Sequence, residues 1–384
     1  MLALSVRRQA ITLAVGALSL TLAAQRPVYT VGGASPDFPS LPAAVAAVPP
    51  GSILRVLPGV HEGFTTGKPL RVLLEFDALS GTIQAPAGSA HAISIVGLPA
   101  GDEFVLLGRD APVQAGAVGG IRIANCGGPV VLERIYVVAG GGAVGIEVEN
   151  AAVVHLRRSV FAGISGLLAQ DTTLMVSECV VVGTGGPGSA IDHARFEATR
   201  TYFTGWQQPG LRLSHCVARM TSNGQSAVTV AGASVPVAAI EAIDCQLQMD
   251  TATLGLLPAN GAPGLELVGG SLLAEEVPML TTSLATPGQL ATATMTSAAP
   301  RLGVMVLGDL MPAPTLLELG SFFVDVGTAP IVLAIGVCDA NGLGASGTVP
   351  TAAALYGHIW CVQGAVERIG ALPLFSGPGL LIAL

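Results

Sequence analysis

The sequence predicts an all-β protein whose main body is a parallel β-solenoid. One short phrase recurs about seven times between Gly120 and Leu267. Each copy holds an alternating apolar pair, a polar turn residue, a second apolar run and a glycine-rich stretch. The apolar pairs begin at Ile121, Ile146, Leu167, Ile191, Leu211, Val228 and Leu265. Repeats of this size, made of short alternating strands, stack into solenoids.

The composition agrees with this fold class and excludes one class of binding partner. Of 384 residues, 51% are hydrophobic and only 11% are charged, with 50 glycines and 26 prolines. Long surface helices need a charged solvent face, so many short strands joined by tight turns are favoured. The net charge of −8 argues against a nucleic-acid-binding protein, which would carry a basic surface.

Residues 1–24 are typical of a signal peptide. Arg7 and Arg8 precede an apolar run over 10–22, and small residues follow it. The run is too short to span a bilayer, which takes roughly 20 residues. A retained anchor and a twin-arginine route are the alternatives. We expect an exported protein, secreted or in the cell envelope, with no membrane span after cleavage.

The rest of the chain divides into a solenoid over 27–285 and a C-terminal β domain over 286–384. Asp37 or Ser40 can cap a short helix whose apolar side is Leu41, Val45 and Val48, and this helix would cover the open end of the solenoid. Beyond 285, short apolar runs alternate with proline and glycine, which predicts a small antiparallel sandwich. That domain serves either attachment or sorting, or caps the far end of the solenoid.

The N-terminal segment carries a family resemblance. Phe38, Leu41 and Ala44-Val45 form an aromatic-x-x-Leu-x-x-Ala-Val pattern, and a strand follows that ends in Pro58-Gly59. Residues 28–285 thus resemble the pectin-lyase-like superfamily, which implies a right-handed parallel β-helix. The superfamily includes lyases, hydrolases, esterases, adhesins and surface proteins without known activity. The tail looks like C-terminal modules of exported planctomycete-type bacterial proteins.

A row of arginines is the candidate glycan-binding site. Arg134, Arg158 and Arg200 recur in the second apolar run of successive phrases, with Glu178 among them. Stacked on one face, their guanidinium groups could grip the carboxylates or sulfates of an acidic polysaccharide in bidentate forks. In the alternative, Glu178 bridges Arg158 and Arg200 on a solvated face.

The turn slot after each apolar pair is polar. By the phrase alignment it holds Asn125, Asn150, Asp171, Arg195 and His215. Asparagine and aspartate tolerate left-handed backbone geometry, so this slot predicts an asparagine ladder. The same alignment turns His193 inward onto an apolar ladder and pairs Asp192 with Arg212 on the next coil.

Sequence patterns that indicate catalysis are weaker than those that indicate binding. Gln170-Asp171-Thr172 with Asp192 downstream resembles the aspartate pair of pectinesterases, but the surrounding family motif is missing. A polysaccharide lyase would use Arg134, Arg158 or Arg200 to neutralise a uronate carboxylate. The longest interruption, 249–263, is almost uncharged, which favours binding over catalysis. We expect no cofactor and no metal site.

Six cysteines in an exported chain invite disulfides. Cys126 and Cys216 share one slot of the repeat, and Cys179 and Cys245 share another. Each pair lies several coils apart, beyond the limit of about 7 Å between the Cα atoms that a disulfide joins. Cys338 and Cys361 lie outside the repeat on two predicted strands and are the candidate disulfide, with two free thiols as the alternative.

Two function classes follow from these observations. The first is a noncatalytic cell-envelope or extracellular protein whose long face binds glycan, such as acidic polysaccharide, or another surface component. The second is a carbohydrate-active enzyme, a lyase before a pectinesterase-like esterase or a hydrolase.

Overall fold

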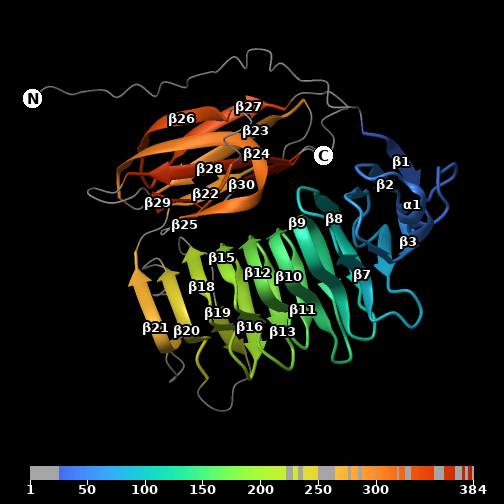
Figure 1. The fold of residues 1–384 in the computed structure, drawn as a ribbon, viewed down its shortest axis with the longest axis horizontal. Helices are drawn as coiled ribbons and strands as arrows, with labels where there is room; N and C mark the ends of the chain where they lie inside the picture. Colours follow the sequence, from blue (N-terminus) through green and yellow to red (C-terminus); the bar gives the residue numbers. More distant parts are fainter. Residues whose placement is uncertain are drawn as a thin grey trace, which may run out of the picture.

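The computed structural model is a parallel β-solenoid of about nine turns followed by an antiparallel β domain (Figure 1). The solenoid fold class predicted from the repeat is thereby confirmed. The structure describes residues 26–221 without a break and then 228–231, 237–249, 264–275, 278–283, 288–297, 299–317, 320–324, 330–349, 359–367, 374–376 and 379–382. The expected signal peptide, 1–24, and the interruption at 250–263 lie outside these ranges.

Each coil contributes to three parallel sheets, and long strands run round a corner from one sheet into the next. Sheet 1 holds β1 (Val28–Val31), β2 (Ile53–Val56), β5 (Arg71–Leu74), β15 (Arg195–Thr199) and β18 (Val217–Thr221). Sheet 2 holds β3 (Gly59–Glu62), β6 (Gly81–Gln84), β11 (Val160–Gly163), β13 (Val180–Gly183), β16 (Tyr202–Trp206) and β19 (Val228–Ala231). Sheet 3 holds β4 (Phe64–Thr66), β7 (His91–Val96), β14 (Ser189–Asp192) and β17 (Leu211–Ser214).

The remaining solenoid strands cross between sheets. They are β8 (Phe104–Gln114), β9 (Gly119–Val138), β10 (Val144–Arg157), β12 (Leu167–Ser177), β20 (Ile240–Met249) and β21 (Leu265–Ala274). Every pairing from β1 to β21 is parallel and joins successive coils nearly residue for residue. Valine, leucine, isoleucine and phenylalanine fill the interior from Val31 to Met249 as one continuous core.

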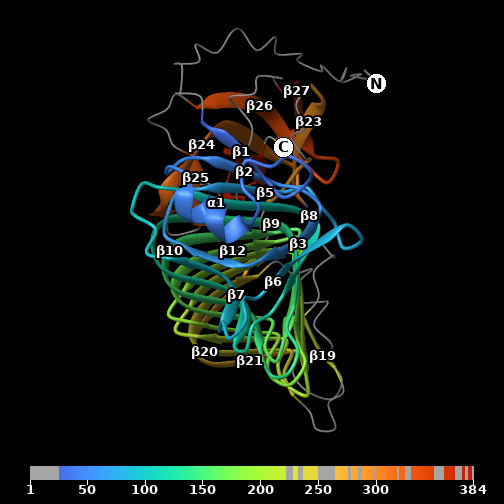
Figure 2. The ribbon, with the colours of Figure 1, turned by 90° about the vertical axis from the view of Figure 1, so that its right-hand side faces the viewer.

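The predicted helix closes the N-terminal end of the solenoid (Figure 2). Helix α1 runs over Leu41–Ala47, and Ser40 is its N-cap, whose hydroxyl accepts a hydrogen bond from the Ala43 amide. At the other end of α1, the ammonium group of Lys68 donates to the carbonyls of Val45, Ala46 and Val48. The only lysine of the chain thus satisfies carbonyls that the helix leaves open.

A column of glycines sets the register of sheet 3. Gly120, Gly145, Gly166, Gly188 and Gly210 stack on successive coils, each immediately before the first inward position of sheet 3. A Cβ at Gly188 would lie 2.4 Å from the carbonyl oxygen of Gly210, and one at Gly145 equally close to that of Gly166. Backbones approach so closely here that only glycine fits.

The C-terminal domain is an antiparallel sandwich, as predicted. One sheet holds β22 (Met279–Thr282), β23 (Leu290–Thr296) and β27 (Leu343–Thr348). The other holds β24 (Arg301–Leu317), β25 (Gly320–Val324), β26 (Ile331–Cys338), β28 (Ile359–Val366), β29 (Leu374–Phe375) and β30 (Gly379–Ile382). β22 lies before the expected boundary at 285/286 but pairs antiparallel with β23, so it belongs to the sandwich.

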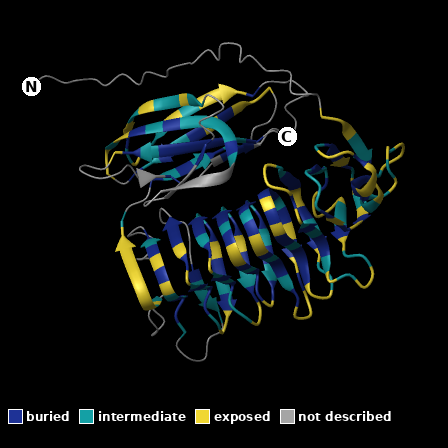
Figure 3. Cartoon of the chain, in the orientation of Figure 1, coloured by how far each residue is buried: buried dark blue, intermediate teal, exposed yellow. Residues whose placement is uncertain are grey.

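The sandwich packs against the side of the solenoid and does not cap its far end. Apolar residues of sheet 1, among them Val131, Val153 and Met175, form one buried cluster with Phe323 and Ile359 of the sandwich. The last solenoid strand, β21, is mostly exposed (Figure 3). The expectation of a far-end cap is therefore wrong, because the apolar outer face of sheet 1 is the surface that the sandwich covers.

Charged groups cross the same interface. The Arg157 guanidinium lies 3.3 Å from Glu133 within sheet 1 and donates to the Leu380 carbonyl at 2.7 Å. It also donates to the hydroxyl of Thr282. Beside it, His155 is fully buried and its ring meets Phe323 edge-on, with the centroids 5.8 Å apart.

All six cysteines are free and buried. Cys338 and Cys361 form no disulfide, since their strands flank β24 on opposite sides, in register with Arg301 and Gly308. The predicted slot of Cys245 is wrong: it stacks on Cys216 of the preceding coil and not on the slot of Cys179. The backbone amide of Cys216 donates to the sulfur of Cys245. Burial raises the pKa of Cys179 to about 12 and that of Cys216 to about 11, so both thiols are inert packing groups.

The glycine column predicts a position-specific loss of stability. Gly188→Ala forces its methyl group against the Gly210 carbonyl, and we expect a loss of about 1–3 kcal/mol in the free energy of unfolding. Gly140→Ala is the matched control, because its Cβ would have no neighbour within 4 Å. Chemical denaturation followed by circular dichroism measures both. Equal losses in the two variants would contradict the assigned register.

Burial of His155 predicts a pH dependence of stability. Burial, reinforced by the positive charge of Arg157, lowers the pKa of His155 to about 3, whereas an unfolded histidine titrates near 6.5. Below about pH 6.5 the unfolded chain therefore takes up a proton that the folded chain refuses, and stability falls as pH falls.

Against the non-titrating variant His155→Leu, the parent protein should lose stability by up to about 1.4 kcal/mol per pH unit between pH 6 and pH 4. Denaturation curves of both proteins at each pH give this difference directly. Parallel stability profiles would show that His155 is protonated equally in both states.

Candidate functional site

From Asn125 to Asp244, successive coils turn from sheet 3 into sheet 1 through one residue with left-handed backbone geometry. Their φ angles lie between 46° and 53°, and the residues stack on successive coils. We call them the first turn row: Asn125, Asn150, Asp171, His193, His215 and Asp244. Asparagine and aspartate adopt this conformation more readily than most other residues. The amide of Asn150 donates to that of Asn125 at 2.8 Å, which is the start of the predicted asparagine ladder.

A groove of about 620 Å³ follows the first turn row. It spans four coils and has a mostly polar lining, made by Asn125, Cys126, Gly127, Asn150, Ala151, Ala152, Asp171, Thr172, Thr173, His193 and Arg195. Because the coils are in register, equivalent positions recur along the groove at about 4.8 Å intervals, and the turn position is polar on all four coils. The groove is therefore a periodic polar surface.

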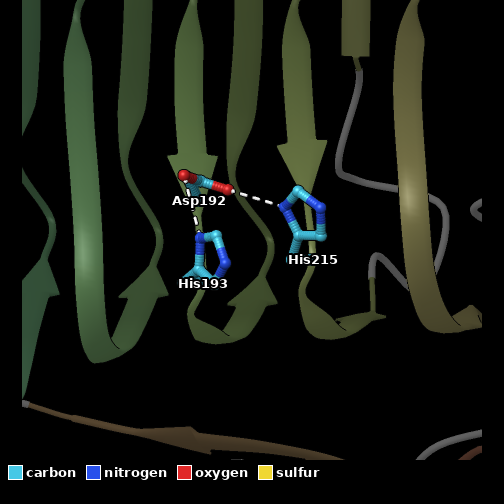
Figure 4. Close-up of side chains that lie close together, drawn as sticks. All are labelled: Asp192, His193 and His215. Atoms are coloured by element: carbon cyan, nitrogen blue, oxygen red, sulfur yellow. Dashed lines mark hydrogen bonds and ion pairs between the residues drawn. The ribbon is translucent and has the colours of Figure 1, made fainter.

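One end of the groove leads to a cluster of Asp192, His193 and His215 (Figure 4). Nδ1 of His193 lies 3.0 Å from one carboxylate oxygen of Asp192, and Nδ1 of His215 lies 3.2 Å from the other. The two imidazole rings are stacked, with centroids 4.5 Å apart and planes inclined by 22°. On its far side, Nε2 of His215 lies 3.9 Å from a carboxylate oxygen of Asp244.

The histidines control the ionisation of Asp192. Its slight burial acts to raise the pKa of the carboxyl group, but hydrogen bonds to His193 and His215 and the charge of these rings outweigh burial. The net effect lowers the pKa of Asp192 below its ordinary value. A carboxylate therefore faces both rings at neutral pH.

The position of His193 corrects the sequence alignment. His193 does not face the core: it stands in the first turn row with its side chain 54% exposed, and Arg195 begins β15 instead of filling that slot. The cause is Ser189, which pairs with Leu167 and Leu211 at the first inward position. The phrase alignment predicts Ile191 at this first inward position, which is two residues further along the chain than Ser189.

The same shift changes the partner of Asp192. It was expected to pair with Arg212, but Arg212 lies in register with Ala190 and its Nε is 2.7 Å from Glu241. The repeat predicts that Val228 begins a sheet 3 strand, but it pairs with Phe203 in sheet 2. The sheet 3 strand of that coil begins at Ile240.

The predicted arginines do stack, but they have partners within the protein. They belong to a second turn row, between sheets 1 and 2, whose residues all have left-handed φ angles: Asp110, Arg134, Arg158, Glu178 and Arg200. Arg134 lies 2.8 Å from Asp110, and Glu178 lies 3.0 Å from Arg158 and 3.5 Å from Arg200. The alternative in which Glu178 bridges its two neighbours is confirmed.

Arg158 is also tied to the C-terminal sandwich. Its guanidinium lies 3.2 Å from Glu133 and donates to the carbonyl oxygen of Thr282. The second turn row thus mixes acidic and basic residues that form ion pairs with one another, and it partly adjoins the sandwich, which favours a structural role. Glycan binding by Arg134, Arg158 and Arg200 stays a prediction.

The pectinesterase-like aspartates fall on adjacent coils. Asp171 lines the groove, and Asp192 lies at the end of β14 in register with Gln170. Asp192 is engaged by two histidines that the pectinesterase resemblance did not include. The site is therefore an aspartate–histidine cluster at the end of a polar groove.

No protein-family model and no curated protein sequence matches the chain. Among solved structures, it is similar to tailspike protein 2 from Escherichia coli O157:H7 bacteriophage CAB120, with 12% sequence identity and a TM-score of 0.29. The match covers 83% of this chain and 58% of the tailspike chain, so this chain spans less than two thirds of that protein. The fold assignment rests on the parallel, in-register pairing of the strands themselves.

Proposed function

We propose that this chain is an exported, noncatalytic β-solenoid protein of the cell envelope or extracellular space that binds polysaccharide in the groove beside the first turn row. The observation that carries the proposal is the periodic polar lining of that groove. A linear polymer with repeating hydroxyl groups suits a surface on which successive coils each present a polar side chain at the same position: Asn125, Asn150, Asp171 and His193. Relationship to the pectin-lyase-like superfamily belongs to the same proposal.

The charge of the groove bears on the class of polysaccharide. Asp171 and Arg195 both line it, so the groove carries one negative carboxylate and one positive guanidinium group, and their charges offset one another. Hydrogen bonding, more than net charge, would then select the ligand. Neutral glycans are therefore candidate ligands beside the acidic polysaccharides that the arginine row suggests. The binding site proposed here is the groove, on the other corner of sheet 1 from the second turn row.

Export rests on the signal sequence expected over 1–24. Within the described part of the chain, no helix is long and apolar enough to cross a membrane. An exported protein meets polysaccharides at the cell surface, which agrees with a groove open to long polymers. The inert, buried thiols place no demand on the redox state of the compartment.

A carbohydrate-active enzyme is the second candidate, with a lyase before an esterase or a hydrolase. The aspartate–histidine cluster favours it, because a histidine held by a carboxylate is a common form of general base. His193 lines the groove and Asp192 holds its Nδ1. In this account the base, and not the arginine row, would define the active site.

Binding is tested by filling the groove. Ala152 lines it, and Ala152→Trp should abolish retention in affinity electrophoresis through gels that contain a panel of acidic and neutral polysaccharides. The matched control, Ala78→Trp, adds the same side chain to an exposed turn on an early coil and should be retained like the parent. Equal retention of both variants would contradict binding in the groove.

The contribution of the turn row is tested by Asn150→Gly, which removes the amide and keeps the left-handed backbone free of strain. We expect retention at least about threefold weaker, the effect of losing about one hydrogen bond. Unchanged retention with every ligand would mean that the asparagine ladder only stabilises the turn.

The enzyme alternative has its own readout. The purified protein is incubated with the same panel, and the supernatant is examined by mass spectrometry for unsaturated oligosaccharides, methanol and acetate. Release of any product that His193→Asn abolishes would establish the enzyme and overturn the noncatalytic proposal. Retention without product is the expected result.

A further inference from the structure

We propose that Asp192, His193 and His215 bind a divalent transition-metal ion such as Zn²⁺. These side chains offer one carboxylate and two imidazole ligand atoms that all lie within 4.8 Å of one another. The proposal concerns only this cluster and stands whether or not the groove binds polysaccharide.

The spacing of the ligand atoms suits tetrahedral coordination. Zinc binds nitrogen and carboxylate oxygen at about 2.0–2.1 Å, which separates neighbouring ligands by roughly 3.3 Å. Nδ1 of His193 lies 3.0 Å from one carboxylate oxygen of Asp192 and Nδ1 of His215 lies 3.2 Å from the other, so each nitrogen–oxygen separation is close to this value. Both Nδ1 atoms already point at the carboxylate (Figure 4), so the ion would take the place of the protons in these contacts. A small turn of the stacked rings brings both nitrogens onto the ion.

Asp244 lies behind His215, where a modest approach of its carboxylate would give a metal-bound histidine its outer support. With Nδ1 of His215 on the metal, the ring proton lies on Nε2, which faces the Asp244 carboxylate at 3.9 Å. A carboxylate behind a metal-bound histidine fixes the tautomer and raises the basicity of the ligand. Asp244 holds this place because it occupies the first turn row on the coil after His215.

The backbone holds the ligands before any ion arrives. His193 and His215 both have left-handed backbone geometry, and their amides donate to the carbonyls of Ser214 and Ile243 on the following coils. In-register stacking keeps the two Cα atoms about 4.8 Å apart. The backbone therefore needs no rearrangement to present both imidazoles to an ion, which reduces the cost of binding.

The donor set selects the ion. Two imidazoles and one carboxylate suit Zn²⁺, Ni²⁺ or Cu²⁺, whereas Ca²⁺ and Mg²⁺ prefer sites made of oxygen ligands alone. Three protein ligands leave at least one position for water. The side chains are 42–54% exposed, so solvent reaches that position.

The test uses the purified full chain, stripped with a chelator and titrated with ZnCl₂ in an isothermal calorimeter. We expect one zinc per chain. As a readout that needs no variant, Cu²⁺ bound in the same protein should show hyperfine coupling to two imidazole nitrogens in its electron paramagnetic resonance spectrum. CaCl₂ at the same concentration should give no binding heat.

Variants assign the ligands. His193→Asn and His215→Asn remove one imidazole each with a residue that tolerates the left-handed turn, and both should weaken zinc binding by more than about 100-fold. Asp244→Asn disturbs only the outer support and should weaken it by about 10–100-fold. The matched control is Asp110→Asn in the second turn row, which should bind zinc like the parent.

Several results would overturn the proposal. They are absence of zinc binding by the folded parent, preference for calcium over zinc, a copper spectrum without nitrogen coupling, or parent-like affinity in His215→Asn. Any of these would leave the cluster as an ordinary set of surface hydrogen bonds around Asp192.

Discussion

The whole molecule depends on the in-register stacking of successive coils, each bent at two corners by a single residue in the left-handed conformation. Parallel pairing places equivalent residues about 4.8 Å apart, so a side chain at a corner always meets its counterparts above and below. The glycine column, from Gly120 to Gly210, makes this pairing specific by admitting no side chain where the backbones approach. The chemistry of the surface is therefore set by residues at equivalent positions of successive coils, and not by motifs that are contiguous in the sequence.

The two corners of sheet 1 carry different chemistry. At the corner with sheet 2, Arg158 pairs with Glu178 and donates to the C-terminal sandwich, so that row stabilises the assembly of the two parts. At the corner with sheet 3, the first turn row borders an open groove and ends in the cluster around Asp192. The sandwich covers the apolar face between the two corners, which leaves the first turn row as the accessible polar edge.

The solenoid, the helical cap and the sandwich were predictable because each leaves a periodic or punctuated pattern in the sequence. The candidate site was not, because Ser189 replaces the large apolar residue that marks the first inward position of sheet 3. Aligning on apolar residues moved the register to Ile191 and turned His193 inward. Aligning on Gly188 would have placed His193 in the turn beside His215. The docking of the sandwich depends on tertiary contacts that no local pattern encodes.

Cysteine cross-linking tests this register most directly. The account predicts that His193→Cys combined with His215→Cys forms a disulfide under mild oxidation, because neighbours in one turn row lie about 4.8 Å apart. Arg195→Cys with His215→Cys should not, since two residues of offset place the Cα atoms roughly 8 Å apart, beyond the bridging limit of about 7 Å. Peptide mass spectrometry identifies each link. Cross-linking of the second pair in preference to the first would contradict the stacking on which the site rests.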